Sequence, residues 1–571
     1  MEGERARRHA YDARMTASAR DVRPAQRPPN TLRALLVLIA IATGLKLCLI
    51  LAPPVDIQAG GHGMEEELMR GTAAQEFLDG PLLPFMDYQV NGFSGGSLVV
   101  SVLAVPLFAT FGAKLFVLRL VTLLFGALGV ASVFLVLDRW VSRRAAWVGG
   151  LLLAIPPPGY SIVSTTAWGT HLENNALTLF VLFLWLRVHS DGRRGFLAQL
   201  ALGIAAGFAT YFGYVFLVAL AVLLLFELLA DKLFFLRAAF FARVIGFAVG
   251  FSPWIAYNLQ HGFSGLRPYG RSFAEHFMGD RAISEALTSI ETFLAADLPG
   301  SFYMPSIAGI SNAILSAVMY VVLLLLVLAA IIHHRASIAR AAAALVRRRP
   351  GFDWHPTAVF AAYPIAYVAA YAVSDFRVET LHVQQFRYAM PVLPWLFLLA
   401  AVGFDALAGR KQYFQPAGWV LAGTFLLLSL AGNVDRCEFA GAPESWKHRG
   451  RTPAGLARVI AENYITDHAE LGRIVDRITA GRPKQVQHDL LFTTGQTLKF
   501  YVRPGEESAL TPRARERLPD YGRTLDFLHA AVAPAFVLYF ERPVPDETIF
   551  RHPRDRDRFL AERERRLEES D

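Results

Sequence analysis

The sequence predicts an all-α polytopic membrane protein with about eleven transmembrane helices, outer-face juxtamembrane helices and a small C-terminal α/β extracytoplasmic domain. Of its 571 residues, 54% are hydrophobic and only 18% are charged, and the mean hydropathy is +0.35. One soluble domain is therefore excluded. Apolar runs of about 17 to 25 residues, the length that crosses a hydrocarbon core, recur between residues 31 and 432. From residue 433 onward the composition is charged and mixed.

The N-terminal tail, residues 1–30, is polar and rich in arginine. The apolar run at 31–52 has no small-residue cleavage site behind it, which predicts an uncleaved anchor with a cytoplasmic N-terminus. Lys and Arg are enriched in cytoplasmic loops, so the later basic clusters should lie on the same side. These clusters are residues 139–144, 187–194, 232–243, 335–349 and 410–411.

Twelve apolar segments are candidates to cross the membrane. They are 31–52, 97–111, 115–137, 145–158, 174–187, 195–211, 212–230, 244–258, 312–332, 357–373, 388–408 and 417–432. If all twelve crossed, the basic clusters in the middle of the chain would lie outside. The segment 97–111 is short for a span and contains Pro106, so we expect it to lie along the outer surface. Eleven crossings then place the basic clusters inside.

With this topology, the outer loop 53–114, the loop 259–311 and the C-terminal domain 433–571 all lie outside. The transmembrane domain is predicted to span 31–432. Within the C-terminal domain the pattern predicts a helix at 453–478, a buried strand "AFVLYF" at 535–540 and a charged helix at 551–569.

Several other classes of protein are excluded by composition. Cys48 and Cys437 are the only cysteines, so neither a disulfide framework nor a Cys-based zinc spacing is present. The net charge of +8 is explained by basic cytoplasmic loops. No basic patch interleaved with aromatics points to nucleic acid.

The first outer loop carries three consecutive carboxylates in "GMEEEL", residues 63–68. In a helix beginning here, Glu66 pairs with Arg70 at i,i+4, and acids in a first turn suit the helix dipole. The ion pair and the helix dipole are sufficient structural explanations for Glu66 and Glu67. We expect Glu67 to be solvated. Glu65 shares its helical face with apolar residues such as Phe77, where a carboxylate is costly without a task. Glu65 is therefore the functional candidate.

The segments after this loop follow a recognisable order. An acidic pair is followed by "EFLDG", "PLLPFMDYQVNGF", an apolar segment ending in "FATFG", and "LFVLRL". This order resembles the C-type integral-membrane glycosyltransferases, particularly protein O-mannosyltransferases and lipid A aminoarabinose transferases. In that family the segment before the arginine is juxtamembrane, as expected for 97–111. The resemblance implies catalytic roles for Glu65 and Glu66, with Glu65 in place of the usual Asp, and donor binding by Arg119.

The stretch "STTAWGTHLENN", 164–175, lies at the outer end of a predicted crossing. Relatives carry an acidic residue here, which falls on Glu173, with His171 two positions earlier. Interfacial hydrogen bonding, acceptor binding and a divalent ion all remain open for this pair.

A second stretch, "QQFRYAMPVLPWLFLLAA" at 384–401, resembles the family segment near the lipid phosphate. Arginine suits phosphate because its planar fork donates two parallel charged hydrogen bonds. A plain membrane-interface anchor of Arg and Tyr is the alternative. The residues implied in donor binding are Arg387, Tyr388 and Pro391, with Arg377 and His382 as neighbours.

The resemblance implies a glycosyltransferase that moves a hexosyl or pentosyl group from a polyprenyl-phosphate donor to a protein, lipid or glycan acceptor at the outer face. Glu65 is the expected general base, Arg387 and Arg377 offset the charge on the leaving phosphate, and single displacement implies inversion. No cofactor is required, and a divalent cation is left open. The expected location is the bacterial inner membrane. A transporter or flippase of lipid-linked sugars and a non-catalytic scaffold are the alternatives.

Overall fold

A computed structural model describes residues 30–51, 67, 70–71, 73–74, 77–78, 84–89, 92–112, 115–190, 195–231, 233–267, 283–302, 309–347, 355–374, 385–409 and 415–441. Its elements are helices. The longer ones are α2 (Thr31–Leu51), α4 (Gly96–Phe111), α6 (Val121–Trp140), α7 (Arg143–Ala154), α9 (Leu172–Ser190), α10 (Phe196–Phe212), α11 (Phe216–Ala230), α12 (Ala238–Gln260), α14 (Ile283–Thr292), α16 (Asn312–Arg347), α17 (Pro356–Val373), α18 (Leu393–Ala408) and α19 (Gln415–Gly441). The short ones are η1 (Phe85–Tyr88), α5 (Leu115–Arg119), α8 (Pro158–Val163), η2 (Phe234–Leu236), η3 (Ser264–Leu266), the π-helical η5 (Phe293–Asp297), α15 (Leu298–Gly300) and η6 (Gln385–Tyr388).

Each of the twelve predicted apolar segments overlaps a helix in this structure. Within the described residues, six helices are long and apolar enough to cross a membrane, namely α2, the helix at 116–140, α12, α16, α17 and α19. Four shorter apolar helices, α4, α10, α11 and α18, accompany them. The segment predicted at 97–111 is the 16-residue α4, with Pro106 inside it.

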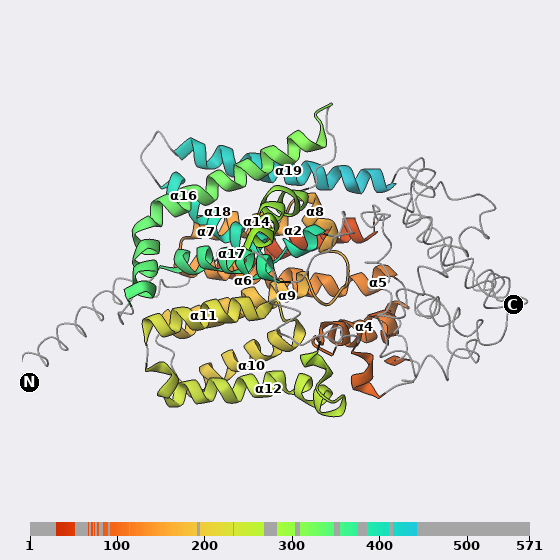
Figure 1. Ribbon diagram of the computed structural model, residues 1–571. Coiled ribbons are helices and arrows are strands. Elements are labelled where there is room, and N and C mark those ends of the chain that lie inside the picture. The colour runs from red at the N-terminus through yellow and green to blue at the C-terminus, as the bar shows by residue number, and fades with distance from the viewer. Residues whose placement is uncertain are drawn as a thin grey trace, which may run out of the picture.

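The helices form a bundle in which most axes run side by side (Figure 1). Helices α16 and α19 lie at one edge, and α10 and α12 at the other. Helix α18 occupies the interior, where it packs against α7, α16, α17 and α19. Its side chains are buried along nearly the whole helix, Leu393 to Phe404 without interruption. The core therefore lies in the middle of the bundle.

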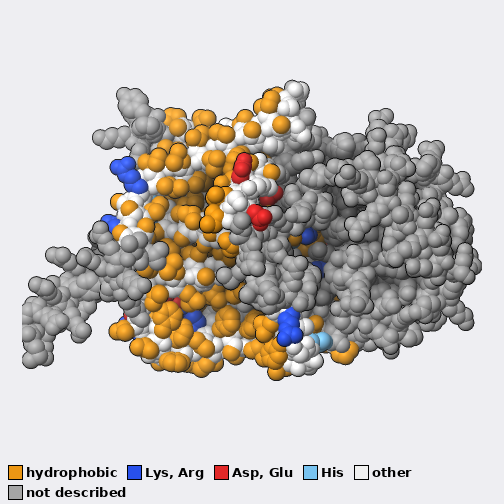
Figure 2. All heavy atoms as spheres, viewed as in Figure 1, with side chains coloured by type: hydrophobic (Ala, Val, Ile, Leu, Met, Phe, Trp, Pro, Cys, Tyr) orange, Lys and Arg blue, Asp and Glu red, His pale blue; other side chains and the backbone are white. Residues whose placement is uncertain are grey.

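The outer surface of the bundle is apolar rather than charged. Hydrophobic side chains cover most of the described face in Figure 2. Exposed examples include Leu197, Leu236, Ile365 and Leu427. Water would disfavour such a surface, whereas lipid accepts it, so the chain is an integral membrane protein.

Basic residues gather where several helices end. At the junction of α6, α7 and α18, Ser142 donates to Asp405 at 2.7 Å and Arg143 pairs with Asp138 at 2.9 Å. A second junction joins α9, α10, α11 and α12, where Glu227 accepts hydrogen bonds from Arg243 and pairs with His189. The predicted clusters at 139–144, 187–194 and 232–243 thus begin or end these helices.

The sequence predicted where the transmembrane domain ends and which elements form the C-terminal domain. Helix α19 continues to Gly441, beyond residue 432, the expected end of the transmembrane domain. The predicted C-terminal helices and strand lie outside the described residues.

Candidate active site

The candidate site lies at one end of the bundle, where four parts of the chain meet. They are the acidic loop from Glu67, the end of α5, the segment 164–171 that joins α8 to α9, and η6. The contacts below centre on Trp168, whose side chain is buried among the described residues.

Glu67 is buried and ion-paired. Its side chain is 0% exposed. Arg119 donates from Nε to Oε1 at 2.9 Å and from Nη2 to Oε2 at 2.6 Å, and the Ala167 amide donates to Oε1 at 2.9 Å. Such a two-pronged arginine–carboxylate contact is strong and directional. The prediction that Glu67 is solvated is wrong, because Arg119, distant in sequence, compensates the buried charge.

Arg70 joins the same segment from the acidic loop. It is 2% exposed, and its Nε donates to the Trp168 carbonyl at 3.1 Å. Glu66, its predicted ion-pair partner, lies outside the described residues. The helix predicted to start near residue 64 is present at the described positions of 67–78, which are helical.

Arg387 approaches Trp168 from η6. Its guanidinium carbon lies 5.2 Å from the centre of the Trp168 ring and 5.0 Å from that of Tyr388. Its Nη2 donates to the Tyr388 hydroxyl at 3.0 Å, and the Tyr367 hydroxyl of α17 donates to the Tyr388 carbonyl at 2.8 Å. Aromatic faces attract cations at this range, so the guanidinium is fixed by aromatic rings.

His171 lies between the same aromatic residues. Its ring meets Trp168 edge-on at 4.8 Å and Tyr388 at 6.0 Å. Burial holds the pKa of His171 well below its usual range, and the charges of Arg387 and Arg70 lower it further. His171 is therefore neutral at pH 7.

Glu173 begins α9 and is also buried. Its Oε1 accepts a hydrogen bond from the Gly169 amide at 3.2 Å, while within the described part of the chain Oε2 has no hydrogen-bond partner. Gly169 has a φ of +73°, and a Cβ on Gly96 would lie 1.7 Å from the Gly169 carbonyl oxygen. Glycine is needed at both positions, because the segment 164–171 packs directly on the start of α4.

The possible divalent-ion site is not formed by the described residues. Among them, no group of three or more His, Cys, Asp and Glu side chains is close enough to hold a metal. His171 instead contacts aromatic rings, and Glu173 binds a backbone amide. The sequence left a divalent ion open as one of three alternatives for this pair, and the described residues do not test a site that includes residues outside them.

The structure brings together five of the residues that the sequence singled out. They are Arg119, His171, Glu173, Arg387 and Tyr388. Glu65, Glu66, Arg377 and His382 lie outside the described residues, so their positions stay predictions.

Three residues of the site were missed from the sequence, namely Glu67, Arg70 and Trp168. Trp168 lies inside "STTAWGTHLENN", where a large aromatic beside a glycine in an outer-face turn was the available signal. Glu67 and Arg70 were assigned to the surface of their helix, and no local pattern identifies the distant partner of Glu67.

Comparisons with known proteins give distant likenesses. No family model and no curated protein matches the chain. The crystal structure of ArnT from Cupriavidus metallidurans bound to undecaprenyl phosphate is similar, with a TM-score of 0.46 and 17% identity over 89% of this chain and 78% of that one. The archaeal oligosaccharyltransferase AglB from Archaeoglobus fulgidus, in complex with an inhibitory peptide and a dolichol-phosphate, gives a TM-score of 0.42 and 14% identity over 76% and 59%.

Both likenesses have TM-scores below 0.5 and identities below 25%. At these TM-scores and identities the likeness says nothing about the reaction or the site residues of this chain. The function is therefore argued from the residues themselves.

Proposed function

We propose that this protein transfers a sugar from a polyprenyl-phosphate donor to an acceptor at the outer face of the membrane. One observation carries the proposal: the acidic loop and Arg387 meet at the segment around Trp168. Arg70 donates to the Trp168 carbonyl, the Ala167 amide donates to Glu67, and Arg387 stacks over the Trp168 ring. The described end of the acidic loop and two guanidinium groups thereby lie together at one end of an apolar bundle.

Arg387 is the proposed ligand of the donor phosphate. Stacking on Trp168 engages the flat face of the guanidinium, whereas phosphate is bound by N–H groups in its plane, so both contacts are compatible. A phosphate that departs during transfer gains negative charge, and a fixed cation stabilises it most in the transition state. We extend this role to Arg377, which neighbours η6 in sequence.

Glu65 is the proposed general base on the acceptor hydroxyl. Glu67 lies two residues further on, but both of its carboxylate oxygens already accept hydrogen bonds. We therefore assign Glu67 the task of holding the loop against Arg119 and Ala167, and Glu66 a role beside Glu65.

The direction of two helices supports an outer-face location of the site. The α5–α6 helix runs from Arg119 in the site to the basic cluster at Arg139, and α9 runs from Glu173 to Arg187. The site and the basic clusters are therefore at opposite ends of these helices. Because basic clusters favour the cytoplasmic side, we place the site outside, in a bacterial inner membrane.

A flippase of lipid-linked sugars is the second candidate. The observation that favours it is Lys46, a partly buried lysine inside α2, since ionisable residues within membrane helices often mark transport paths. The two functions differ in outcome, because only the transferase forms a new glycosidic bond.

The test uses the full chain purified into proteoliposomes. Polyprenyl-phosphate hexoses and pentoses are supplied as donors with protein, lipid and glycan acceptors, and mass spectrometry detects the product. A fluorescent donor lipid measures flipping in parallel. We expect a glycosylated acceptor and an increase in free polyprenyl phosphate. Flipping without transfer would support the second candidate and overturn the first.

Three variants separate the glutamates. Glu65→Gln should lower kcat by about 100-fold or more, the effect of losing a general base, with little change in the donor KM. Glu66→Gln should have a smaller effect. If Glu65→Gln transfers as well as wild type while Glu67→Gln loses kcat at unchanged KM and stability, the base is Glu67 and our assignment is wrong.

A further inference from the structure

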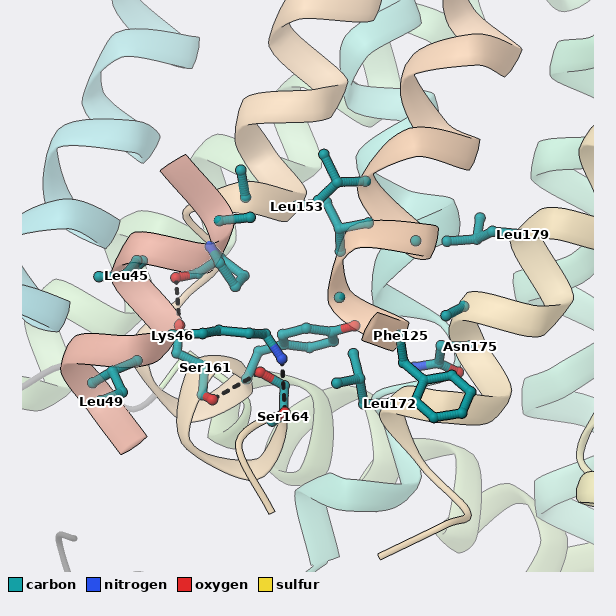
Figure 3. Close-up of a pocket in the computed structure, with 18 residues that line it drawn as sticks. Leu45, Lys46, Leu49, Phe125, Leu153, Ser161, Ser164, Leu172, Asn175 and Leu179 are labelled. Atoms are coloured by element: carbon teal, nitrogen blue, oxygen red, sulfur yellow. Dashed lines mark hydrogen bonds between the residues drawn. The ribbon is translucent and has the colours of Figure 1, made fainter. Parts of the chain in front are cut away.

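Lys46 is a partly buried lysine inside a membrane helix that the proposed chemistry does not use. It lies on α2 five residues before the helix ends at Leu51, in a helix of high mean hydropathy. A charge at this depth is costly without a partner or a task. Figure 3 shows the Lys46 side chain extending across a small cavity. The cavity has a volume of about 20 Å³ and is lined also by Tyr160, Ser161 and Asn175.

Lys46 binds the start of the segment 164–171. Its Nζ donates to the Ser164 carbonyl at 2.7 Å, and the Ser164 hydroxyl donates to the Ser161 carbonyl at 2.8 Å (Figure 3). The facing helix makes room for the lysine, because a Cβ on Gly126 of α6 would lie 3.2 Å from Lys46 Cε. The contact thus links α2 to the segment across the interior of the bundle.

The far end of the same segment is held by Glu173. Its Oε1 accepts from the Gly169 amide, and its side chain is buried. Lys46 and Glu173 therefore hold the segment at Ser164 and at Gly169, respectively. Between these anchors lie Ala167 and Trp168, which contact the acidic loop and Arg387.

We propose that Lys46 is a positioning residue: by holding the Ser164 carbonyl, with Glu173 holding Gly169, it fixes the segment that orients Glu67 and Arg387 for sugar transfer. This role rests on the proposed function. Lys46 touches neither donor nor acceptor, so its loss should lower kcat more than it weakens donor binding.

Lys46→Met removes the charge and the donor but keeps the length of the side chain. The Ser164 carbonyl then loses its partner, so the segment 164–171 should open more readily. Hydrogen–deuterium exchange reports this directly, because the Ala167 and Gly169 amides donate to Glu67 and Glu173. We expect exchange of peptides that cover 164–171 to be about tenfold faster, with the rest of the bundle unchanged.

The matched pair Gly126→Ala and Gly129→Ala tests the same point without altering a charge. Both glycines line the cavity on α6. A Cβ on Gly126 presses on Lys46 at 3.2 Å, whereas a Cβ on Gly129 meets Leu153 and Ala176 at an ordinary 3.5 and 3.7 Å. Gly126→Ala should raise exchange in 164–171 modestly, and Gly129→Ala should match wild type. If Lys46→Met does not fold, Lys46→Gln and Gly126→Ala provide the comparison.

The full chain in lipid nanodiscs is used for exchange and for kinetics with the polyprenyl-phosphate sugar that the wild type uses. We expect Lys46→Met to lower kcat by about 10- to 100-fold, which is the effect expected when reacting groups are slightly misplaced. The KM for the donor should stay within about twofold of the wild-type value. Unchanged exchange, or faster exchange with unchanged kcat, overturns the role of Lys46 and leaves the proposed function intact. If the wild type transfers no sugar but Lys46→Met still speeds exchange in 164–171, the proposed function fails while the anchor stands.

Discussion

The ion pair between Glu67 and Arg119 gives the sharpest prediction from the geometry of the site. The two side chains are 0% and 7% exposed, so removing one partner leaves the other charge buried. Such a loss costs about 3–5 kcal/mol of unfolding free energy. Glu67→Gln and Arg119→Met should each destabilise by this amount. Glutamine can still accept the Ala167 amide, so that contact is kept.

The double variant carries the decisive comparison. With both charges gone, no buried charge is left unpaired, so the loss should be no larger than that of either single variant, and the coupling energy should be about 3–5 kcal/mol. Unfolding is followed by tryptophan fluorescence as SDS is titrated into mixed micelles. As a control, Arg237→Met breaks a half-exposed pair with Asp231 and should cost about 1 kcal/mol or less. Additive losses at Glu67 and Arg119 would refute the reasoning.

Three further predictions concern packing, pH and metal dependence. Gly207→Ala should lower the free energy of unfolding by about 1–3 kcal/mol in the same assay, because its Cβ would lie 2.1 Å from the Phe247 carbonyl oxygen. Gly423→Ala, whose Cβ would meet nothing within 4 Å, should not destabilise the protein. Equal effects of the two variants would contradict the close α10–α12 contact. His171 stays neutral in the folded protein but takes up a proton near its usual pKa of about 6.5 in the unfolded chain, so the stability should fall as the pH drops from 7 to 5. His171→Gln should flatten this pH profile of stability. Identical profiles of wild type and variant would contradict the prediction. Transfer should persist after EDTA treatment, because guanidinium groups supply the positive charge, and loss restored by a divalent cation would contradict this.

The helices were predictable because their length and apolar character are local. Each predicted segment coincides with a helix, and the breaks have local causes. Helix α7 ends at Ala154, just before the prolines of 156–158, and α10 ends beside Gly213. Helix α4, with 16 residues, is as short as the sequence predicted. The glycines that let α10 and α12 approach closely, such as Gly207 and Gly250, were not predicted, since the helical period does not identify which helix packs against which.

The site was predictable only in part, because its contacts join distant segments. Arg387, His171 and Glu173 were identified because their segments resemble those of the C-type glycosyltransferases. Glu67 was misjudged because a helical pattern predicts which face of the helix a side chain occupies, but not what packs against that face. Its partner Arg119 is 52 positions away in the sequence. Lys46 was missed because its partner is a backbone carbonyl, and every residue type has one.

Binding of the donor phosphate by Arg387 is the central claim, and one equilibrium measurement tests it directly. Polyprenyl phosphate is titrated into nanodiscs that contain wild type or Arg387→Gln, and tryptophan fluorescence is recorded, since Trp168 lies 5.2 Å from the guanidinium. Losing a charge-assisted contact of about 1.5–3 kcal/mol should weaken binding by at least about tenfold. Equal affinity of the two proteins would contradict the account.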